Sequence, residues 1–233
     1  MTVVISVGGS IIAPEGVDCD FVRSFCALVR RFVAHGERRM VLICGGGAPA
    51  RRYQEAYREI SASTAHEEQD RIGIAATRLN AALLHAALAD LTDRPLLLNP
   101  EELDQGPQFS GRVLVSGGWK PGFSTDFVAV TLAEKCGADT VINLSNIDKV
   151  YSADPRTNPD AQPLDTISWT DFRRLVGDEW VPGANLPFDP IATRRAAELG
   201  LRVIAAGRDI ANLELILEGK PFVGTTIGAA APD

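Results

Sequence analysis

The chain has 233 residues, of which 45% are hydrophobic and 23% charged, a balance typical of a globular protein and not of a disordered one. Its formal net charge of -7 argues against a broad surface for nucleic acid or anionic membrane, so an anionic ligand would depend on locally placed donors. No stretch reads as a signal segment or a bilayer-spanning helix, and we expect a cytoplasmic protein with no membrane partner.

Apolar strand patterns alternate with helical patterns along the chain. The expected strands cover residues 2–7, 39–44, 95–98, 112–116, 140–144, 201–206 and 223–227. The expected helices cover residues 18–35, 48–60, 67–91, 125–136, 169–176, 189–199 and 210–217. A hairpin is expected to start at residues 150–151, and the Pro-, Asp- and Asn-rich segment 154–166 to be loop. The alternation predicts an α/β fold, a three-layer α/β/α sandwich with a mostly parallel central sheet, in a single domain over residues 1–233.

Two of these strands end in glycine clusters, residues 8–10 (GGS) and residues 45–47 (GGG). Such a loop leaves backbone N–H groups bare, and where it leads into a helix N-terminus it suits phosphate oxygens. One cluster alone would be ordinary turn chemistry, but the pair favours a site with phosphate on both sides. Arg51, in the first turn of the next helix, can fold back over a phosphate or be solvated. Arg52 is expected to be a solvated helix residue.

The third strand-to-helix loop, residues 116–126, combines three glycines and the hydroxyl groups of Ser124 and Thr125 with Lys120. A hydroxyl of Ser124 or Thr125 can cap the following helix. Capping alone explains neither Trp119 nor Lys120, so we expect this loop to belong to the site.

The fourth loop, residues 145–155, is dense in side chains able to hold a purine base and ribose, although a polar hairpin with an Asp-Pro turn is an equal alternative. Asp70, near the start of the long helix, is either a dipole-favourable charge or an acceptor for ribose hydroxyls. Asp189, followed by Pro190, is either an N-cap or a residue that orients cations or Mg²⁺. Because the carboxyl ends of parallel strands lie at one edge, all four loops are expected to converge there.

Other chemistries find little support in the sequence. The four cysteines show no C-x-x-C pairing, and Cys26 and Cys44 lie in apolar patterns, which favours small buried residues in a reducing compartment. The three histidines show no ligand spacing, so we expect no structural metal site. There is no G-x-S-x-G elbow, the first glycine cluster does not continue as a P-loop, and the G-x-G-x-x-G dinucleotide fingerprint is missing.

Taken in order, the motifs resemble the amino acid kinase superfamily and, within it, the archaeal-type uridylate (UMP) kinases. The matching stretches are residues 5–10 (ISVGGS), 44–53 (CGGGAPARRY), 70–80 (DRIGIAATRLN), 119–126 (WKPGFSTD), 143–155 (NLSNIDKVYSADP) and 187–193 (PFDPIAT). The resemblance implies transfer of the γ-phosphoryl group of ATP to UMP with Mg²⁺, in pyrimidine nucleotide synthesis. It also implies a homo-oligomer, typically a hexamer built from dimers.

Site roles follow from the resemblance position by position. The residues that would hold UMP are Gly46, Asp70, Trp119, Lys120, Pro121, Gly122, Phe123, Ser124 and Thr125. The residues that would contact ATP are Gly9, Ser10, Gly47, Arg51, Ser145, Asn146, Asp148, Tyr151 and Asp154. Those expected to act on the transferring phosphoryl group are Lys120, Asp189 and Arg51.

The chain departs from the family pattern at two positions. Ser6 stands where many superfamily kinases carry a lysine, and Lys149 replaces a common glycine. These changes leave open which cation neutralises the phosphoryl group, with Lys120 the first candidate and Lys149 the second. They also keep two alternatives: a kinase of another small phosphate or carboxylate, or a non-catalytic nucleotide or oxyanion store of the molybdate type.

Overall fold

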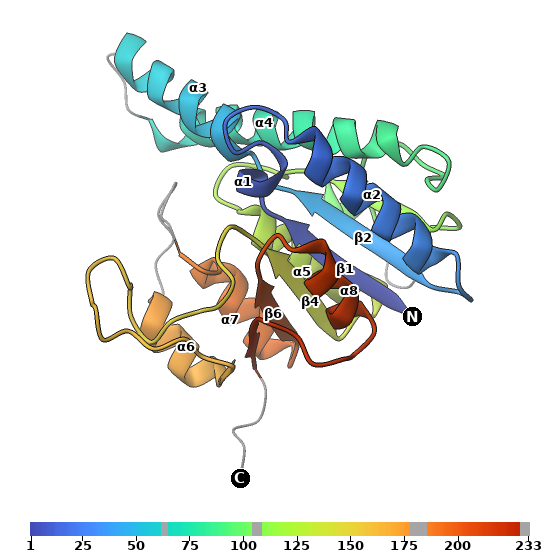
Figure 1. Ribbon diagram of the computed structural model, residues 1–233. Helices are drawn as coiled ribbons and strands as arrows, with labels where there is room; N and C mark the ends of the chain where they lie inside the picture. Colours follow the sequence, from blue (N-terminus) through green and yellow to red (C-terminus); the bar gives the residue numbers. More distant parts are fainter. Residues whose placement is uncertain (62–64, 104–108, 178–185, 229–233) are drawn as a thin grey trace.

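A seven-stranded sheet runs through the part of the chain that the computed structural model describes, residues 1–61, 65–103, 109–177 and 186–228 (Figure 1). The strands are β1 (Thr2–Val7), β2 (Arg39–Cys44), β3 (Val113–Ser116), β4 (Thr140–Leu144), β5 (Thr166–Ile167), β6 (Arg202–Ala206) and β7 (Thr225–Ile227). Their order in the sheet is β3-β2-β1-β4-β6-β7-β5.

Five neighbouring strands of this sheet, β3, β2, β1, β4 and β6, are parallel. β7 runs antiparallel to β6, and β5 is parallel to β7. The carboxyl ends of the five parallel strands therefore lie along one edge, as the alternating sequence pattern predicts. This edge is where α/β sheets bind their ligands.

Helices cover both faces of the sheet (Figure 1). They are α1 (Gly9–Ile12), α2 (Cys19–Val33), α3 (Gly47–Ile60), α4 (His66–Ala87), α5 (Thr125–Cys136), α6 (Trp169–Val176), α7 (Pro190–Glu198) and α8 (Ile210–Leu217), with a 3₁₀ turn η1 (Pro100–Glu102). Alternate residues of β1 feed two cores: Val3, Ile5 and Val7 pack with α2, α4 and α8, whereas Val4 packs with α5, α6 and α7. This alternation confirms the three-layer α/β/α architecture.

Local signals in the sequence explain where several helices begin and end. Asp18 and Ser124 accept hydrogen bonds from backbone N–H groups in the first turns of α2 and α5. Gly137 ends α5 in the left-handed conformation, with φ +63°, which glycine adopts without a Cβ clash.

Some expected elements differ in the structure. Residues 95–98 do not form a strand, because only Leu97 makes a single bridge, to Ser116. The first glycine cluster is not simply a loop, because Gly9 opens the short helix α1. The long helix ends at Ala87 and not at residue 91, since the chain turns there before the connection to β3. The expected hairpin forms as one antiparallel bridge between Tyr151 and Pro163.

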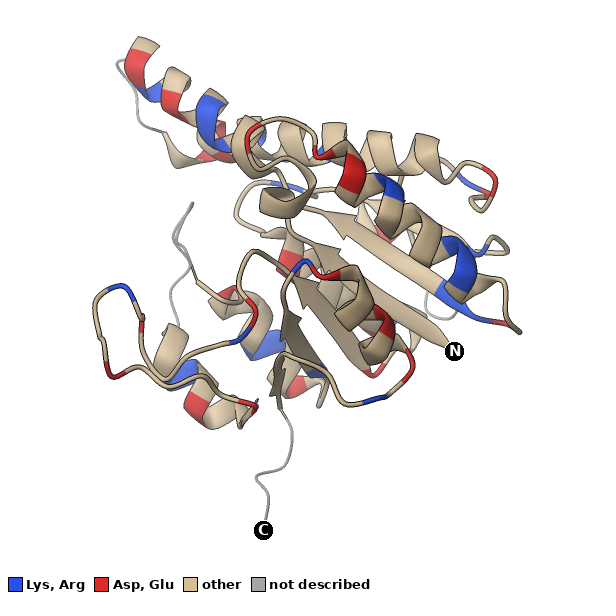
Figure 2. Ribbon diagram, viewed as in Figure 1, with Lys and Arg blue, Asp and Glu red and all other residues tan. Residues whose placement is uncertain are grey.

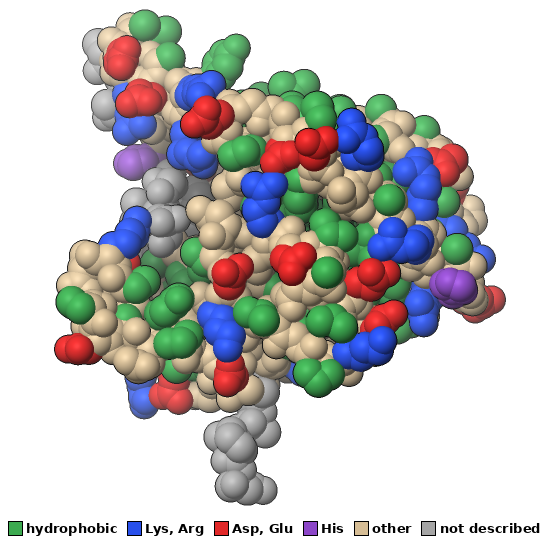
Figure 3. Space-filling view, in the orientation of Figure 1, with side chains coloured by type: hydrophobic (Ala, Val, Ile, Leu, Met, Phe, Trp, Pro, Cys, Tyr) green, Lys and Arg blue, Asp and Glu red, His purple; other side chains and the backbone are tan. Residues whose placement is uncertain are grey.

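Charges of both signs are interspersed over the helices (Figure 2). On the face shown in Figure 3, acidic and basic side chains alternate with apolar ones, without a broad basic patch. Within the described residues, none of the helices combines the length and apolarity required to cross a bilayer.

Candidate functional site

The two glycine clusters lie against each other at the carboxyl edge of the sheet. A Cβ at Gly9 would lie 2.0 Å from the backbone nitrogen of Gly47, and a Cβ at Gly47 would lie 2.2 Å from the carbonyl oxygen of Gly9. Gly47 also has a φ of +67°, which L side chains rarely adopt. The clusters therefore meet backbone to backbone, as two loops around adjacent phosphates require.

Hydrogen bonds between neighbouring strands fix the positions of these clusters. The N–H of Gly45 donates to the carbonyl of Val7 at 2.9 Å, and the N–H of Gly8 donates to the carbonyl of Leu144 at 2.8 Å. The N–H of Ser145 in turn donates to the carbonyl of Ala206 at 3.0 Å. The ends of β1, β2, β4 and β6 are thus linked into one rim.

The third loop is attached to the same rim through α4. The N–H of Gly118 donates to the hydroxyl of Thr77 at 2.7 Å, and the N–H of Gly122 donates to Asp70 at 2.9 Å. The same helix contacts the second glycine cluster, because Asn80 donates to the carbonyl of Gly45 at 2.7 Å. The structure therefore brings Asp70 and Gly122 together and places the Trp119–Lys120 segment on the helix that also holds the glycine cluster.

Lys120 lies exposed above the aromatic side chains of its own loop. Its Nζ is 3.7 Å from the centre of the Trp119 ring and 5.3 Å from that of Phe123. Phe123 in turn packs on Phe127, with ring centres 4.7 Å apart. Such cation–π contacts hold an ammonium group in place without neutralising its charge, so Lys120 keeps a positive charge available at this loop.

Ser124 is the N-cap of α5, a role that requires no ligand. Its hydroxyl caps α5 by accepting from the N–H of Phe127 at 3.1 Å, and Thr125 is the first helical residue. These two residues therefore set the direction of α5. The residue that follows them, Asp126, contributes a carboxylate that sequence reasoning did not assign to the site.

Asp126 lies beside Asp189, although the two are far apart in the sequence. Its Oδ2 accepts from the backbone N–H of Asp189 at 3.2 Å, and its Oδ1 accepts from the hydroxyl of Ser6 at 3.0 Å. Ser6 is thus a hydrogen-bond donor to this carboxylate. Sequence spacing gave no signal for the contact, because it joins β1, α5 and the start of α7.

Asp189 caps α7, as its position before Pro190 predicts. Its Oδ1 accepts from the N–H of Ala192 at 2.6 Å, but its buried Oδ2 has no hydrogen-bond partner among the described residues. Burial raises the pKa of Asp189 above its ordinary value. A buried carboxylate oxygen without a partner is costly unless a ligand satisfies it.

Burial, together with the nearby negative charge of Asp189, raises the pKa of Asp126 to about 7. Within the part of the chain described here, no lysine or arginine makes an ion pair with either carboxyl group. The two acidic groups therefore lie together at the rim, and no lysine or arginine of the described residues pairs with them to favour their ionised forms.

The fourth loop follows β4 directly beside the first glycine cluster. Asn146 and Asp148 are exposed, and Asp148 packs so closely on Gly207 that a Cβ there would lie 2.0 Å from its Oδ1. Tyr151 is half-buried in the bridge to Pro163. The exposed side chains stand where a nucleotide above the sheet edge could reach them.

Asp154, at the far end of this loop, already has a partner within the loop. It makes an ion pair with Arg156 at 2.8 Å, and the contact holds the pKa of Asp154 below its ordinary value. A ligand hydroxyl would therefore have to share this carboxylate with Arg156.

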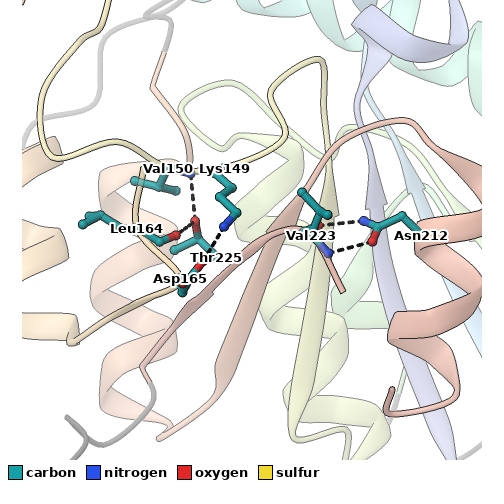
Figure 4. A network of polar contacts seen from close by, with 7 residues as sticks. All are labelled: Lys149, Val150, Leu164, Asp165, Asn212, Val223 and Thr225. Atoms are coloured by element: carbon teal, nitrogen blue, oxygen red, sulfur yellow. Dashed lines mark hydrogen bonds and ion pairs between the residues drawn. The ribbon is translucent and has the colours of Figure 1, made fainter. Parts of the chain in front are cut away.

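Lys149 is engaged in an ion pair within the protein. Its ammonium group pairs with Asp165 (Figure 4). The same figure shows Thr225 tying this region together, since its hydroxyl accepts from the N–H of Val150 at 2.9 Å and donates to the carbonyl of Leu164. The ion pair weakens the second candidate for the missing cation and favours Lys120.

Arg51 lies exposed in the first turns of α3, and the structure records no ion pair or hydrogen bond for it among the described residues. Its guanidinium group is therefore available to a ligand at the rim. Arg52 is also exposed, as expected for a solvated helix residue.

Comparisons with known proteins show what the chain as a whole is similar to. The profile of the "Amino acid kinase family" matches residues 1–205. A uridylate kinase of Methanospirillum hungatei is 36% identical over 97% of this chain and 94% of its own length. One from Thermoplasma volcanium is 35% identical over 97% of both chains.

Solved structures show the same fold. The crystal structure of uridylate kinase from Archaeoglobus fulgidus superposes with a TM-score of 0.82 at 33% identity, covering 97% of this chain and 100% of the other. A UMP kinase from Bacillus anthracis superposes with a TM-score of 0.70 at 19% identity, over 97% and 95% of the two chains. This second likeness concerns the fold alone.

Proposed function

This chain belongs to the amino acid kinase family, and we propose that it transfers the γ-phosphoryl group of ATP to UMP, giving ADP and UDP. The observation that carries the proposal is the direct contact between the two glycine clusters, whose backbones meet between Gly9 and Gly47. Two adjacent sets of backbone donors suit two phosphate chains placed end to end. The uridylate kinases that match over nearly the whole chain support UMP as the acceptor.

UMP is placed on the side of the rim formed by α4 and the third loop. Gly46 and Asp70 face it from the second glycine cluster and from α4, and Trp119 to Thr125 form its other wall. ATP is placed over Gly9, Ser10 and Gly47, with its base and ribose toward residues 145–154. Arg51 stands between the two.

Mg²⁺ fits the carboxylate pair at the rim. Mg²⁺ is commonly held by one or two carboxylates together with substrate phosphates, and no larger cluster of metal-type side chains occurs among the described residues. The partnerless Oδ2 of Asp189 supplies one such oxygen, and Asp126 lies beside it. When bound, the ion would neutralise charge on the phosphoryl oxygens, the task that a lysine at position 6 would otherwise perform.

The protein's own contribution to the reaction is placement and charge. Phosphoryl transfer needs the donor and acceptor oxygens in line, and a phosphate acceptor is already a good nucleophile, so no general base is required. Backbone N–H groups of the two glycine clusters hold the phosphates, and Arg51 and Lys120 offset the charge that spreads over the equatorial oxygens. Asp189 would hold Mg²⁺ beside the transferring phosphoryl group through its partnerless Oδ2.

A panel of acceptors tests the proposal. We expect ATP-dependent ADP release to be fastest with UMP when it is compared with CMP, isopentenyl phosphate and acidic amino acids. A higher kcat/KM with one of the other compounds would mean that this compound, and not UMP, is the acceptor. Binding of ATP with no turnover of any acceptor would instead indicate storage or regulation.

Three further expectations rest on the family resemblance. The protein is proposed to be a homohexamer built from dimers, to lie in the cytoplasm and to serve pyrimidine nucleotide synthesis. Light scattering after size exclusion measures the first of these, and a monomeric mass would contradict it.

A further inference from the structure

Helix α4 holds two loops of the site by their carbonyl oxygens. The Nδ2 of Asn80, a residue only 3% exposed, lies 2.7 Å from the carbonyl oxygen of Gly45 and 3.2 Å from that of Gly46. Arg78, two residues earlier on the same helix, binds the third loop. Its Nε and Nη2 lie 3.1 Å and 2.8 Å from the carbonyl oxygens of Gly118 and Trp119.

Each of these side chains therefore hydrogen-bonds to two consecutive carbonyl groups, an arrangement that we call a clamp. In a planar trans peptide, the C=O of one residue and the N–H of the next point in opposite directions. A carbonyl pulled toward α4 consequently turns the following N–H away from α4. Asn80 aims the N–H groups of Gly46 and Gly47 in this way, and Arg78 aims those of Trp119 and Lys120.

These four N–H groups are available to hydrogen-bond to a ligand. Their neighbours use their own N–H groups inside the protein: Gly45 donates to Val7, and Gly118 donates to Thr77. The backbone N–H groups of residues 46, 47, 119 and 120 have no acceptor among the residues described. Donors left in this state at the surface of a site can be satisfied by a ligand.

Clamping matters most where glycine would otherwise leave the backbone free. Consecutive glycine peptides can rotate through many conformations, and ordering them costs conformational entropy. A buried amide and a guanidinium fork fix these peptides before the ligand arrives. Donors that are already oriented need no reorganisation when charge develops on the phosphoryl oxygens.

We propose that Asn80 and Arg78 are positioning residues that orient the phosphate-binding N–H groups of the two loops without touching either nucleotide. The inference rests on the proposed function and adds to it which nucleotide depends on each of the two residues. Under the proposed function Asn80 serves both nucleotides, because Gly46 is assigned to UMP and Gly47 to ATP. Arg78 serves UMP alone.

The variant Asn80→Asp tests the first clamp, because it keeps the shape of the side chain but replaces the donating NH₂ group with a carboxylate oxygen that repels both carbonyl groups. We expect the KM values for both UMP and ATP to rise, by about 10²-fold at most, as for a misplacement of about 1 Å. Leu84→Ala is the matched control, since this buried α4 residue belongs to the hydrophobic core and its apolar side chain cannot hydrogen-bond to the carbonyl groups of either loop. It should lower the Tm and leave both KM values unchanged.

Arg78→Lys tests the second clamp, because it keeps the charge and loses the two-pronged geometry. We expect a higher KM for UMP with an unchanged KM for ATP. Full UMP affinity in Arg78→Lys would mean that charge and not carbonyl orientation is what Arg78 supplies, and would overturn this half of the proposal. If Asn80→Asp fails to fold, Asn80→Ala measures the same loss without adding a repulsive carboxylate.

Calorimetric binding of ATP separates this inference from the proposed function, because it needs no turnover. Weaker ATP binding in Asn80→Asp than in Leu84→Ala supports the clamp even if the wild-type protein proves not to phosphorylate UMP. Equal ATP binding in the two variants, with similar losses of Tm, would show that Asn80 only stabilises the fold and would overturn the proposal.

Discussion

Replacing Asp126 with asparagine should make the protein more stable at alkaline pH than the wild type. In the wild type, burial and the neighbouring Asp189 raise the pKa of Asp126 from 3.8 to about 7. Asparagine removes the charge and keeps both contacts: its oxygen can accept from the N–H of Asp189, and its amide can donate to the oxygen of Ser6. The substitution therefore isolates the cost of the buried charge.

The interval between 3.8 and about 7 sets the size of the effect. At 1.36 kcal/mol for each pH unit, it corresponds to at most about 4 kcal/mol of unfolding free energy. Because the pKa is raised on folding, the folded state binds the proton more tightly. The stability that the wild type gains from protonated Asp126 is therefore fully present below about pH 4 and is lost as the pH rises through about 7.

Urea unfolding of the two proteins from about pH 4 to about pH 8 measures this difference. We expect the stability advantage of Asp126→Asn to grow with pH across this window. We expect kcat to fall, because the variant loses a carboxylate proposed to hold Mg²⁺. Asp20→Asn is the control, since the side chain of Asp20 is 91% exposed and should show no such trend. A stability difference that stays flat with pH would refute the reasoning.

Three further predictions follow from individual contacts. Gly47→Ala should lose more stability than Gly36→Ala and should raise the KM for ATP. Both residues have φ above +60°, but only at Gly47 would the added Cβ meet backbone, at 2.2 Å. Equal losses of stability in chemical unfolding would contradict this. Lys120→Ala should lower kcat by roughly 10²-fold, as for loss of a preorganised donor, and an unchanged steady-state kcat would remove Lys120 from the mechanism. Iodoacetamide should label exposed Cys19 in the native protein and spare Cys44, since burial raises the pKa of the Cys44 thiol; mass spectrometry showing equal labelling would contradict that burial.

The convergence of the loops could be predicted from the sequence because it follows from local patterns. Apolar strands that alternate with helices form parallel sheets, and the carboxyl ends of parallel strands share an edge. Ser124 and Asp189 were recognisable as candidate caps from their positions before helical patterns, and each caps its helix. These features depend only on neighbours in the chain.

The parts that escaped prediction depend on long-range contacts. The hydrogen bond from Ser6 to Asp126 joins residues 120 positions apart, and no spacing rule connects them. Asn80 reads in the sequence as one polar residue on a helix face, and only the structure shows that it binds the carbonyl groups of Gly45 and Gly46. Residues 95–98 have a strand-like pattern, but only Leu97 finds a bridging partner.

The central claim is that the phosphates of UMP and ATP meet between the two glycine clusters. A bisubstrate analogue, with uridine and adenosine joined through their 5′ oxygens by a chain of phosphates, tests it most directly. The account predicts inhibition that is competitive against both ATP and UMP. Competition with only one of the two nucleotides would contradict it, because it would place the second nucleotide outside the rim.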